Sequence, residues 1–272
     1  MIIRAVIWLG AIVSPDSGRR PFLFWGGVGA SYGLVYGAPM ASWYTWQSAQ
    51  GWRLFDDGAE WKQMDKLGHV WTTYHLSGIY REWALVSGYT SQEAFLWGML
   101  LAWSFQTSIE IADGFFPKWG ASVWDVAANT AGTALFCLSE AIRKSPWRIG
   151  FRFSFWPTAY AQQRPDLLGR GLAQILKDYN GQTYWLCGFH EKLPIGIAIG
   201  HGAEGLLGGY GREPTEVIRA REKRRWILSM DPHWETFFQK GRWALRIFVA
   251  IKTPFPALVY VSPKVRLAWV YF

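Results

Sequence analysis

The chain changes character at Pro146, and this change constrains the fold more than any other feature of the sequence. The residues before Pro146 form helix-like segments with recognisable ends. The segment 148–155 after it alternates apolar side chains with small or charged ones, which is the period of a β-strand. The sequence therefore predicts an α+β protein, with an N-terminal bundle of about four helices and a C-terminal antiparallel β region.

Three of the helices carry clear boundary signals. Thr90 and Glu93 are three residues apart, as a capping box requires, so a helix is expected to begin there. Gly88 suits the left-handed turn beyond the end of the preceding helix. Ser122 begins a third helix, with Asp125 in its first turn. The three helices are predicted at residues 61–87, 90–111 and 122–143.

The segment 21–52 contains no charged side chain and is long enough for a membrane helix. Gly29, Gly33 and Gly37 recur every four residues, so a helix here would present a flat strip that allows a neighbouring backbone to approach closely. Pro39 would end or kink such a helix. Two alternatives stay open: membrane insertion or intimate helix packing, and a glycine-rich leading segment that lies on the domain.

The β region is expected to contain further strands and one helix. Pro254 and Pro256 force an extended approach to the last hairpin, because proline disfavours helix at the residue before it. The strands are predicted at residues 182–189, 195–200, 224–230, 257–261 and 266–271, and the helix at residues 234–251.

The amino end has the layout of a very short export signal. Arg4 is followed by the apolar run 5–13 and then by Ser14, Pro15 and Asp16. A start codon chosen slightly too far downstream would give the same appearance. The predicted organisation is an export signal at 1–20, a helical bundle with a polar centre at 21–145, and a β-rich region at 146–272 that packs on the bundle as one unit.

The contents of tryptophan and of charged residues favour a membrane or envelope setting. The chain of 272 residues contains 19 tryptophans, and charged residues make up 18 %, below the typical quarter of a soluble domain. Amphipathic aromatic rings are favoured where an apolar phase meets water. A soluble protein with a tryptophan-rich core is the alternative.

The net charge of +8 does not predict binding to nucleic acid. The densest basic run, 219–225, is interrupted by one acidic residue and has no helix-turn-helix, zinc-finger or RNA-binding signature beside it. A solvated loop or a patch facing anionic lipid head groups is expected instead. The glycine-rich segment 202–211 lacks the features of a phosphate-binding loop, so no nucleotide site is expected. Cys137 and Cys187 are expected to be free core thiols, with one disulfide as the alternative.

Ionisable residues on three predicted helices suggest one polar centre. On a helix, Asp65 and His69 share a face, and an aspartate one turn from a histidine can orient the ring for general-base chemistry or metal binding. If the three helix faces converge, carboxylates that lie close together raise one another's pKa and favour a shared proton or a bound cation. The candidate catalytic residues are Asp65, Lys66, His69, Glu110, Asp113 and Asp125, and the candidate ligands of a divalent metal are His69, Glu110 and Asp113.

Each member of this polar centre also has a structural interpretation. Asp125 lies where it can cap the helix begun by Ser122. Lys66 can pair with Asp65 or Glu110 in a buried ion pair that fixes the helix register without chemistry. His69 can be a hydrogen-bonded core histidine.

A second polar string, Asp178, Asn180 and Gln182, has the composition of a turn before a strand. These three side chains are candidate binding residues for a carbohydrate or a cation. An ordered turn that docks the sheet on the bundle explains them with fewer assumptions.

Three long strings carry a family resemblance. They are EWKQMDKLGH at 60–69, TSIEIADGF at 107–115, and KDYNGQTYWL at 177–186. With them, the chain after about Gly26 resembles the YfiM-like family of predicted periplasmic or outer-membrane proteins of unknown function. The resemblance implies an envelope location beyond the inner membrane and an amino-terminal export signal, and it implies no reaction. The chain departs from the family pattern at the front, where the export signal is unusually short.

Two functional classes follow from the sequence. The first is a non-catalytic envelope protein, associated with membrane lipid and with other envelope proteins as a subunit or accessory of a larger assembly. The second is a hydrolase of a lipid or cell-wall substrate, with His69 as base, Asp65 as its orienting group, and Glu110 and Asp113 as metal ligands or proton donor.

Overall fold

The computed structural model describes residues 18–37, 51–116, 119–208, 221–237 and 248–272. Contacts between Cα atoms divide the chain into two compact units, one mainly helical and one built on a sheet. The predicted α+β class is confirmed. The helical unit comprises Met1–Asp56 and Thr72–Cys137, and the sheet unit comprises Asp57–Trp71 and Leu138–Phe272.

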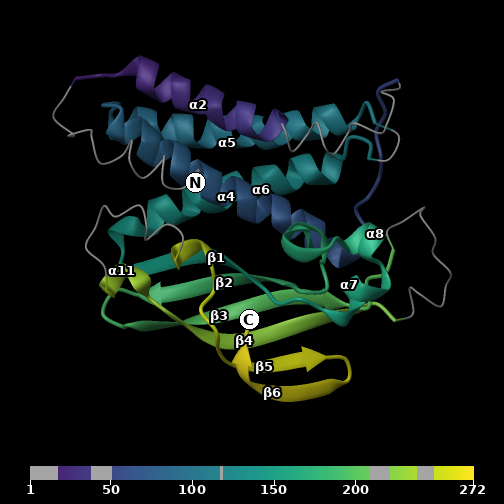
Figure 1. The fold of residues 1–272 in the computed structure, drawn as a ribbon. Helices are drawn as coiled ribbons and strands as arrows, with labels where there is room; N and C mark the ends of the chain where they lie inside the picture. Colours follow the sequence, from purple (N-terminus) through teal and green to yellow (C-terminus); the bar gives the residue numbers. More distant parts are fainter. Residues whose placement is uncertain (1–17, 38–50, 117–118, 209–220, 238–247) are drawn as a thin grey trace. The chain divides into compact units, whose positions relative to one another are not determined.

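The helical unit is organised around long helices with a shared apolar core. Two of them, the helices at 64–86 and 123–141, belong to both units, because the unit boundaries fall between residues 71 and 72 and between residues 137 and 138. In the described ranges, the long helices are α2 (Pro21–Tyr36), α4 (Met64–Val86), α5 (Ser91–Asp113) and α6 (Val123–Ala141) (Figure 1). The buried core contains Phe24, Val28, Tyr80, Ala84, Ala94 and Ala102.

The predicted signals at the junction of α4 and α5 are confirmed. The Thr90 hydroxyl accepts a 3.3 Å hydrogen bond from Glu93 N, and the Glu93 carboxylate accepts a 3.0 Å bond from Thr90 N. These two bonds are the reciprocal pair of a capping box. Gly88 has a φ of 83°, the left-handed conformation that glycine adopts without strain.

The predicted start of α4 at Trp61 is wrong. Trp61, Lys62 and Gln63 have φ values of 51°, 52° and 64°, and the α-helix begins only at Met64. Residues that are distant in the sequence stabilise this left-handed turn. The carbonyl oxygen of Lys62 accepts a 2.9 Å hydrogen bond from Arg224 Nη1. The ammonium group of the Lys62 side chain lies 3.1 Å from a carboxylate oxygen of Glu222.

Helix α2 packs through a different glycine from the ones expected. A Cβ added at Gly29 or Gly33 would meet no atom within 4 Å, whereas a Cβ at Gly27 would lie 1.5 Å from the Trp83 ring. The predicted glycine strip is therefore not the helix contact here, since Trp83 occupies the space over Gly27. The rest of the charge-free segment, 38–50, lies outside the described residues. Of the described helices, none has the length and hydropathy needed to cross a membrane.

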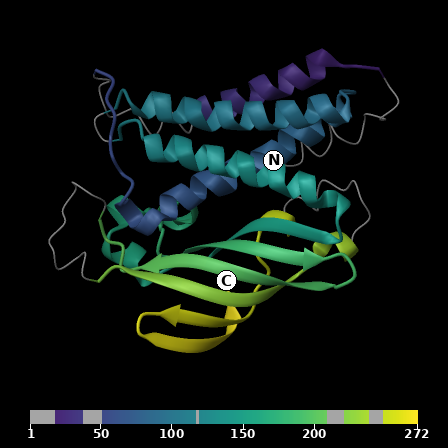
Figure 2. The same ribbon diagram turned by 180° about the vertical axis from the view of Figure 1, so that it is seen from behind.

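Six strands form one antiparallel sheet in sequence order (Figures 1 and 2). The predicted strands are confirmed, most with slightly longer ends. Each strand pairs with the next one in the chain, from β1 with β2 to β5 with β6. The strands are β1 (Trp147–Phe155), β2 (Gln182–His190), β3 (Ile195–Glu204), β4 (Lys223–Pro232), β5 (Phe255–Val261) and β6 (Lys264–Tyr271).

One face of the sheet carries the apolar core of this unit. Every second side chain along the strands points to this face, as strand geometry requires. No disulfide joins Cys187, which lies in this core, to Cys137. The core contains Trp185, Cys187, Phe189, Ala198, Ile227, Ala257 and Val259.

The helix predicted at 234–251 is only partly described. Its first turn is α11 (Trp234–Phe237), and residues 238–247 lie outside the described ranges. Residues 248–250 are helical too, so the predicted end near Ile251 is confirmed to within one residue. Ile251 itself forms a β-bridge with Phe153, and the next backbone N–H donates to the Phe153 carbonyl at 2.8 Å. The connection between β1 and β2 forms the short helices α7 (Ala159–Gln163), α8 (Pro165–Leu168) and α9 (Gln174–Lys177).

Candidate functional site

A network of charged groups surrounds the first turn of α4 in the sheet unit. Lys66 Nζ lies 2.5 Å from Asp57 Oδ2 and 3.0 Å from Asp65 Oδ2. Asp65 also accepts a 2.9 Å hydrogen bond from the Tyr179 hydroxyl. The side chains of Lys66, Asp57 and Asp65 are 12, 13 and 25 % exposed, so these charges are largely withdrawn from water. Asp57, Asp65, Lys66 and Tyr179 are called the Lys66 network below.

His69 and the Lys66 network together keep Asp65 ionised. Burial acts to raise the pKa of Asp65, but the positive charges of His69 and Lys66 and the hydrogen bonds from Lys66 and Tyr179 together hold it below its ordinary value. A carboxylate in this state accepts hydrogen bonds or binds cations. It does not serve as a proton donor near neutral pH.

Tyr184 of β2 lies against the same turn of α4. Burial, with the charge of Asp65 as the second cause, raises the pKa of the Tyr184 hydroxyl, which donates a 2.9 Å hydrogen bond to Gln182 Oε1. A Cβ added at Gly68 would lie 3.0 Å from this hydroxyl. The glycine between Lys66 and His69 therefore allows the helix to approach β2 closely.

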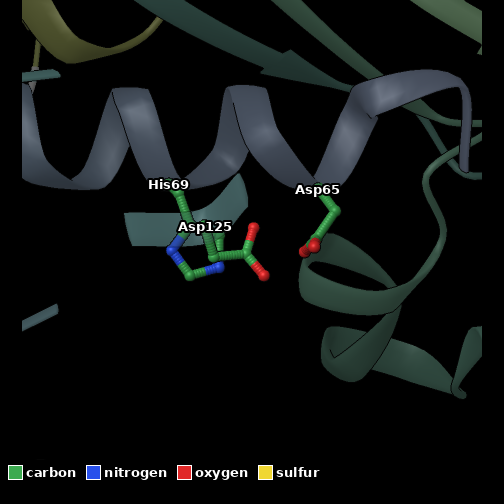
Figure 3. A group of neighbouring side chains, drawn as sticks. All are labelled: Asp65, His69 and Asp125. Carbon is green, nitrogen blue, oxygen red and sulfur yellow. The ribbon is translucent and has the colours of Figure 1, made fainter. Parts of the chain in front are cut away.

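His69 projects from the same side of α4 as Asp65, one turn further along (Figure 3). The predicted sharing of a helix face by these two residues is therefore confirmed. His69 is half-buried. Its charge lowers the pKa of Asp65, as stated above, so the two side chains interact electrostatically.

The helical unit holds a second set of predicted polar residues at the start of α6. Ser122 Oγ accepts a 3.1 Å hydrogen bond from Asp125 N, so the helix begins at Ser122 as predicted and the Ser122 side chain caps it. A carboxylate oxygen of Glu110 lies 3.4 Å from Ser122 N. One turn along, Asn129 Oδ1 accepts a 3.2 Å bond from the Thr73 hydroxyl. Glu110, Asp125 and Asn129 are almost completely buried. The contact with Ser122 N shows that the helical unit brings Glu110 next to the start of α6.

Asp113 lies at the end of α5, and its carbonyl oxygen accepts backbone hydrogen bonds from Phe116 and Gly120. Burial raises the pKa of Tyr36, and the charges of Asp113 and Glu110 add to this effect against an opposing hydrogen bond from Ser108. Glu110 and Asp113 thus act on a common neighbour within the helical unit. Their predicted role as metal ligands with His69, and the convergence of all six candidate residues on one centre, stay predictions.

Hydrogen bonds hold the candidate binding residues Asp178, Asn180 and Gln182 in an ordered turn. Asp178 Oδ2 accepts a 2.6 Å bond from the Thr158 hydroxyl, and its other oxygen accepts from Asn180 N and Nδ2. The Asn180 amide also pairs with both backbone polar groups of Leu206, at 2.7 and 3.0 Å. None of the three side chains is more than 2 % exposed. Their known contacts are those of an ordered turn, and a ligand-binding role for them stays a prediction.

A buried charge cluster that sequence reasoning missed lies on the core face of the sheet. Arg152 Nη1 lies 2.5 Å from Asp231 Oδ2, and Lys252 Nζ lies 3.5 Å from Asp231 Oδ1. All three side chains are at most 1 % exposed. Cys187 Sγ lies 3.7 Å from the same aspartate. Arg152, Asp231, Lys252 and Cys187 are called the Asp231 cluster below.

Burial controls the titration of the Asp231 cluster. Burial raises the pKa of Asp231, against the attraction of Arg152 and Lys252, and it lowers the pKa of Lys252, against the attraction of Asp231. Burial and the Asp231 charge raise the pKa of the Cys187 thiol. Aromatic faces cover both cations, with Arg152 at 4.9 Å from the Phe189 ring centroid and Lys252 at 5.0 Å from that of Trp185.

The alternation of residues 148–155 was the only sequence signal for this cluster. It places Arg152 on the face opposite Phe151 and Phe153, but it does not say which of the two faces is buried. The register pairs Arg152 with Trp185 and so puts it in the core. Lys252 directly follows the segment 234–251 that was predicted to be helical.

One protein family matches part of the chain. Its description is predicted periplasmic lipoprotein (DUF2279), and the match covers residues 49–141, about a third of the chain. The matched residues include α4, α5 and α6 with the six candidate catalytic residues, and they exclude the sheet. No curated protein and no solved structure matches the chain.

The family match agrees with the location expected from the sequence, on the periplasmic face of a membrane in the cell envelope. The finer resemblance to the YfiM-like family stays a prediction. Both cysteines of this chain lie inside the fold, Cys137 in α6 and Cys187 in β2. Over residues 49–141 the chain is similar to an uncharacterised family of predicted periplasmic lipoproteins.

Proposed function

We propose that this protein is a non-catalytic, membrane-associated component of the cell envelope that serves as an accessory or subunit of a larger assembly. The observation that carries the proposal is the Lys66 network. Lys66 joins Asp57 and Asp65, and Tyr179 donates to Asp65 from the turn before β2. These contacts join the start of α4 to the turn before β2 within the sheet unit. They also occupy the groups that acid-base chemistry would need.

The chemistry of the network favours a structural role. A general base must reach a substrate proton at hydrogen-bond distance. Asp65 is instead committed to two donors, Lys66 and Tyr179, and these hydrogen bonds stabilise its ionised form. Largely buried charges persist when they are paired and hydrogen-bonded, and such pairs can fix the register of packed elements. Lys66 has this arrangement.

Exposed apolar side chains on the helical unit support a role in protein contacts. Phe22 of α2, Leu100 of α5, and Val123 and Trp124 of α6 are each more than half exposed. Tryptophan is enriched at the energetic centres of protein interfaces. These side chains provide surfaces on which other envelope proteins can dock.

The direct test is to purify the full chain from cross-linked membranes, identify the proteins that co-purify, and measure bound metals. A reproducible set of partners with no stoichiometric metal is expected. Substituting Val123→Glu and Trp124→Glu should remove partners while leaving the circular dichroism spectrum unchanged. A chain without partners under these conditions would contradict the proposal.

A second candidate function is metal-dependent hydrolysis of a lipid or cell-wall substrate. The observation that favours it is the pair Asp65 and His69 on one side of α4, with Asp65 held ionised (Figure 3). Asp65, His69 and Asp125, the residues labelled in Figure 3, are all of types that supply ligand atoms to divalent metals. Here His69 would be a ligand or a base, and a bound metal would activate water.

Metal analysis of variants separates the two candidates. Stoichiometric metal in the purified chain that is lost in His69→Ala, but kept in the control His190→Ala, would favour hydrolysis. His190 is a suitable control because it lies at the end of β2, away from α4 in the sequence and on another element. Equal and negligible metal in all three proteins is the result that the accessory role predicts.

A further inference from the structure

Three consecutive residues before α4 have left-handed backbone conformations, and none of them is a glycine or an asparagine. Trp61, Lys62 and Gln63 have φ values of 51°, 52° and 64°. In this conformation the Cβ atom comes too close to the following carbonyl oxygen, so residues with a side chain adopt it rarely and singly. Such strain persists only where surrounding contacts impose it, and it is concentrated at functional and switching segments. Residues 61–63 are called the left-handed turn below.

The local sequence favours the opposite hand at the left-handed turn. Lysine and glutamine are good helix formers, and the sequence predicts a helix that begins at Trp61. The observed α-helix begins only at Met64, whose φ and ψ of −62° and −38° are those of a right-handed helix. A right-handed conformation of the three residues would lengthen α4 by almost one turn. The left-handed turn therefore has a second arrangement that is free of this strain.

Contacts from β3 and β4 hold the left-handed turn in place. Arg224 Nη1 donates a 2.9 Å hydrogen bond to the carbonyl oxygen of Lys62, and Arg224 Nη2 donates to Gln63 Oε1. The Lys62 ammonium group lies 3.1 Å from a carboxylate oxygen of Glu222. His201 Nε2 lies 3.4 Å from the Lys62 carbonyl oxygen. Two strands therefore converge on one backbone oxygen of the turn.

Three elements face His201, which is the titratable member of these contacts. Arg224 and Arg225 of β4 place two positive charges near the ring. Lys62 of the left-handed turn contributes its carbonyl oxygen, while an ion pair offsets the charge of its ammonium group. On β2, Tyr184 is paired with His201 in the register and is neutral, because burial raises its pKa. The charges on β4 thus oppose a positive charge on His201.

The neutral form of His201 fits the left-handed turn better than the protonated form does. Burial is the main cause that lowers the pKa of His201, the hydrogen bond to Lys62 opposes it, and the charges of Arg224 and Arg225 add to it. When Nε2 carries the hydrogen that Lys62 accepts, a second proton must sit on Nδ1. His201 Nδ1 is buried and has no hydrogen-bond partner. Protonation is therefore linked to an arrangement in which the turn has moved away and water reaches the ring.

We propose that residues 61–63 are a pH-sensitive conformational switch with two arrangements. In the first, which the structure shows, Arg224 and neutral His201 hold the Lys62 carbonyl oxygen in the left-handed turn. In the second, His201 is protonated and residues 61–63 are right-handed. The Lys62 oxygen then accepts from the backbone N–H of Lys66, four residues on, as in any α-helix. The switch changes the direction in which the chain enters α4.

The switch is connected to the Lys66 network. Trp61 packs on Tyr179, with ring centroids 5.2 Å apart, and the Tyr179 hydroxyl donates to Asp65. A change of hand at residues 61–63 moves the Trp61 side chain and so alters the contact that supports Tyr179. Acidification is therefore expected to loosen the Lys66 network through the backbone, without protonation of its carboxylates.

Distances between two spin labels in the full chain test the switch. The labels are placed at Ala59→Cys, before the turn, and at Val265→Cys on β6, because both positions are exposed. Cys137→Ser removes the other accessible thiol, and Cys187 is buried. Double electron–electron resonance should give one distance at pH 7.5 and a second distance at pH 5.5. The first arrangement is fully favoured above the ordinary histidine pKa of 6.5, and the ratio of second to first should rise by up to about tenfold per pH unit below it.

Two substitutions of Lys62 isolate the conformation of the backbone. Glycine adopts the left-handed conformation without strain, whereas valine, which is β-branched, resists it. Both substitutions remove the same ammonium group, so they differ only in the hand that they favour. Lys62→Gly should show mainly the first distance at both pH values, and Lys62→Val mainly the second. Circular dichroism checks that each variant is folded.

A substitution of His201 isolates the protonation step. His201→Gln keeps an N–H donor but cannot gain a proton near neutral pH, so it should show only the first distance at pH 7.5 and at pH 5.5. His190→Gln is the matched control, because His190 ends β2 and makes none of the contacts of the left-handed turn described above. This control should respond to pH as the chain with the two labels alone does.

Three results would overturn the switch. One is a single distance at both pH values in the chain with the two labels alone, and another is a pH response that persists in His201→Gln. The third is the same distance in Lys62→Gly and Lys62→Val, which would show that the turn has only one arrangement. None of these results bears on the partners sought by cross-linking, so failure of the switch is distinguishable from failure of the proposed function.

Discussion

Two groups of charges in the sheet unit differ in how completely the fold encloses them. The Lys66 network keeps part of its surface in water, whereas the side chains of Arg152, Asp231 and Lys252 are at most 1 % exposed. In the first group, charges and hydrogen bonds outweigh burial and lower the pKa of Asp65. In the second, burial outweighs the attraction and raises the pKa of Asp231. The same residue types therefore have different energetic roles, and removing one partner should cost more where water cannot replace it.

The largest effect is expected at Asp231. Asp231→Ala leaves two cations in the core without their carboxylate, so it should lower the free energy of unfolding by about 3–5 kcal/mol. Urea unfolding followed by tryptophan fluorescence measures this change. A loss below 1 kcal/mol would show that water reaches the Asp231 cluster, and the comparison with the Lys66 network would fail.

A smaller loss is expected for Lys66→Met. The substitution keeps much of the side-chain volume but leaves Asp57 and Asp65 without their shared cation, at a cost of about 1–3 kcal/mol. Arg143→Met on the surface pair Arg143–Glu140 is the control and should cost less than about 0.5 kcal/mol. Equal losses in the two variants would place the Lys66 network among ordinary surface ion pairs.

The pH dependence should separate Asp65 from other acidic groups. Its pKa is lower in the folded chain than its ordinary value of 3.8, so its ionised form stabilises the fold. This contribution is fully present above the ordinary value and is lost as the pH falls through the lower folded value. The difference in unfolding free energy between the wild type and Asp65→Asn should therefore be present at pH 5 and shrink below about pH 4. A difference that grows as the pH falls from 4 to 2 would contradict the assigned direction.

The smallest effect concerns thiol chemistry in the Asp231 cluster. Because burial raises the pKa of Cys187 and the side chain is only 1 % exposed, a maleimide should label it at least about tenfold more slowly than Cys137 in the folded chain. Mass spectrometry of peptides after timed labelling measures both rates, with urea-unfolded protein as the reference. Similar rates for the two cysteines would show that the core around Asp231 opens readily.

Local signals in the sequence predicted much of the fold. The capping box of Thr90 and Glu93, the left-handed Gly88 and the alternation in 148–155 each depend on residues within one turn or strand. Such signals can be read without knowledge of distant contacts. The six strands and the α+β class followed from them.

The failures came from contacts that are distant in the sequence. The left-handed turn at 61–63 depends on Arg224. The Asp231 cluster joins three separate segments, so its burial appears only once the register is known. For the candidate site, helical spacing correctly placed Asp65 and His69 together, but Asp57 and Tyr179 could not be assigned as partners of Lys66 and Asp65 from spacing alone.

The central claim is that the charged residues at the start of α4 hold the fold together rather than perform chemistry. A double-mutant cycle of Asp57→Ala and Lys66→Ala, measured by urea unfolding, tests it most directly. A structural ion pair of this burial predicts a coupling energy of about 1 kcal/mol or more in favour of the pair. A coupling energy near zero, with both single variants as stable as the wild type, would contradict the claim and leave these side chains available for a catalytic role.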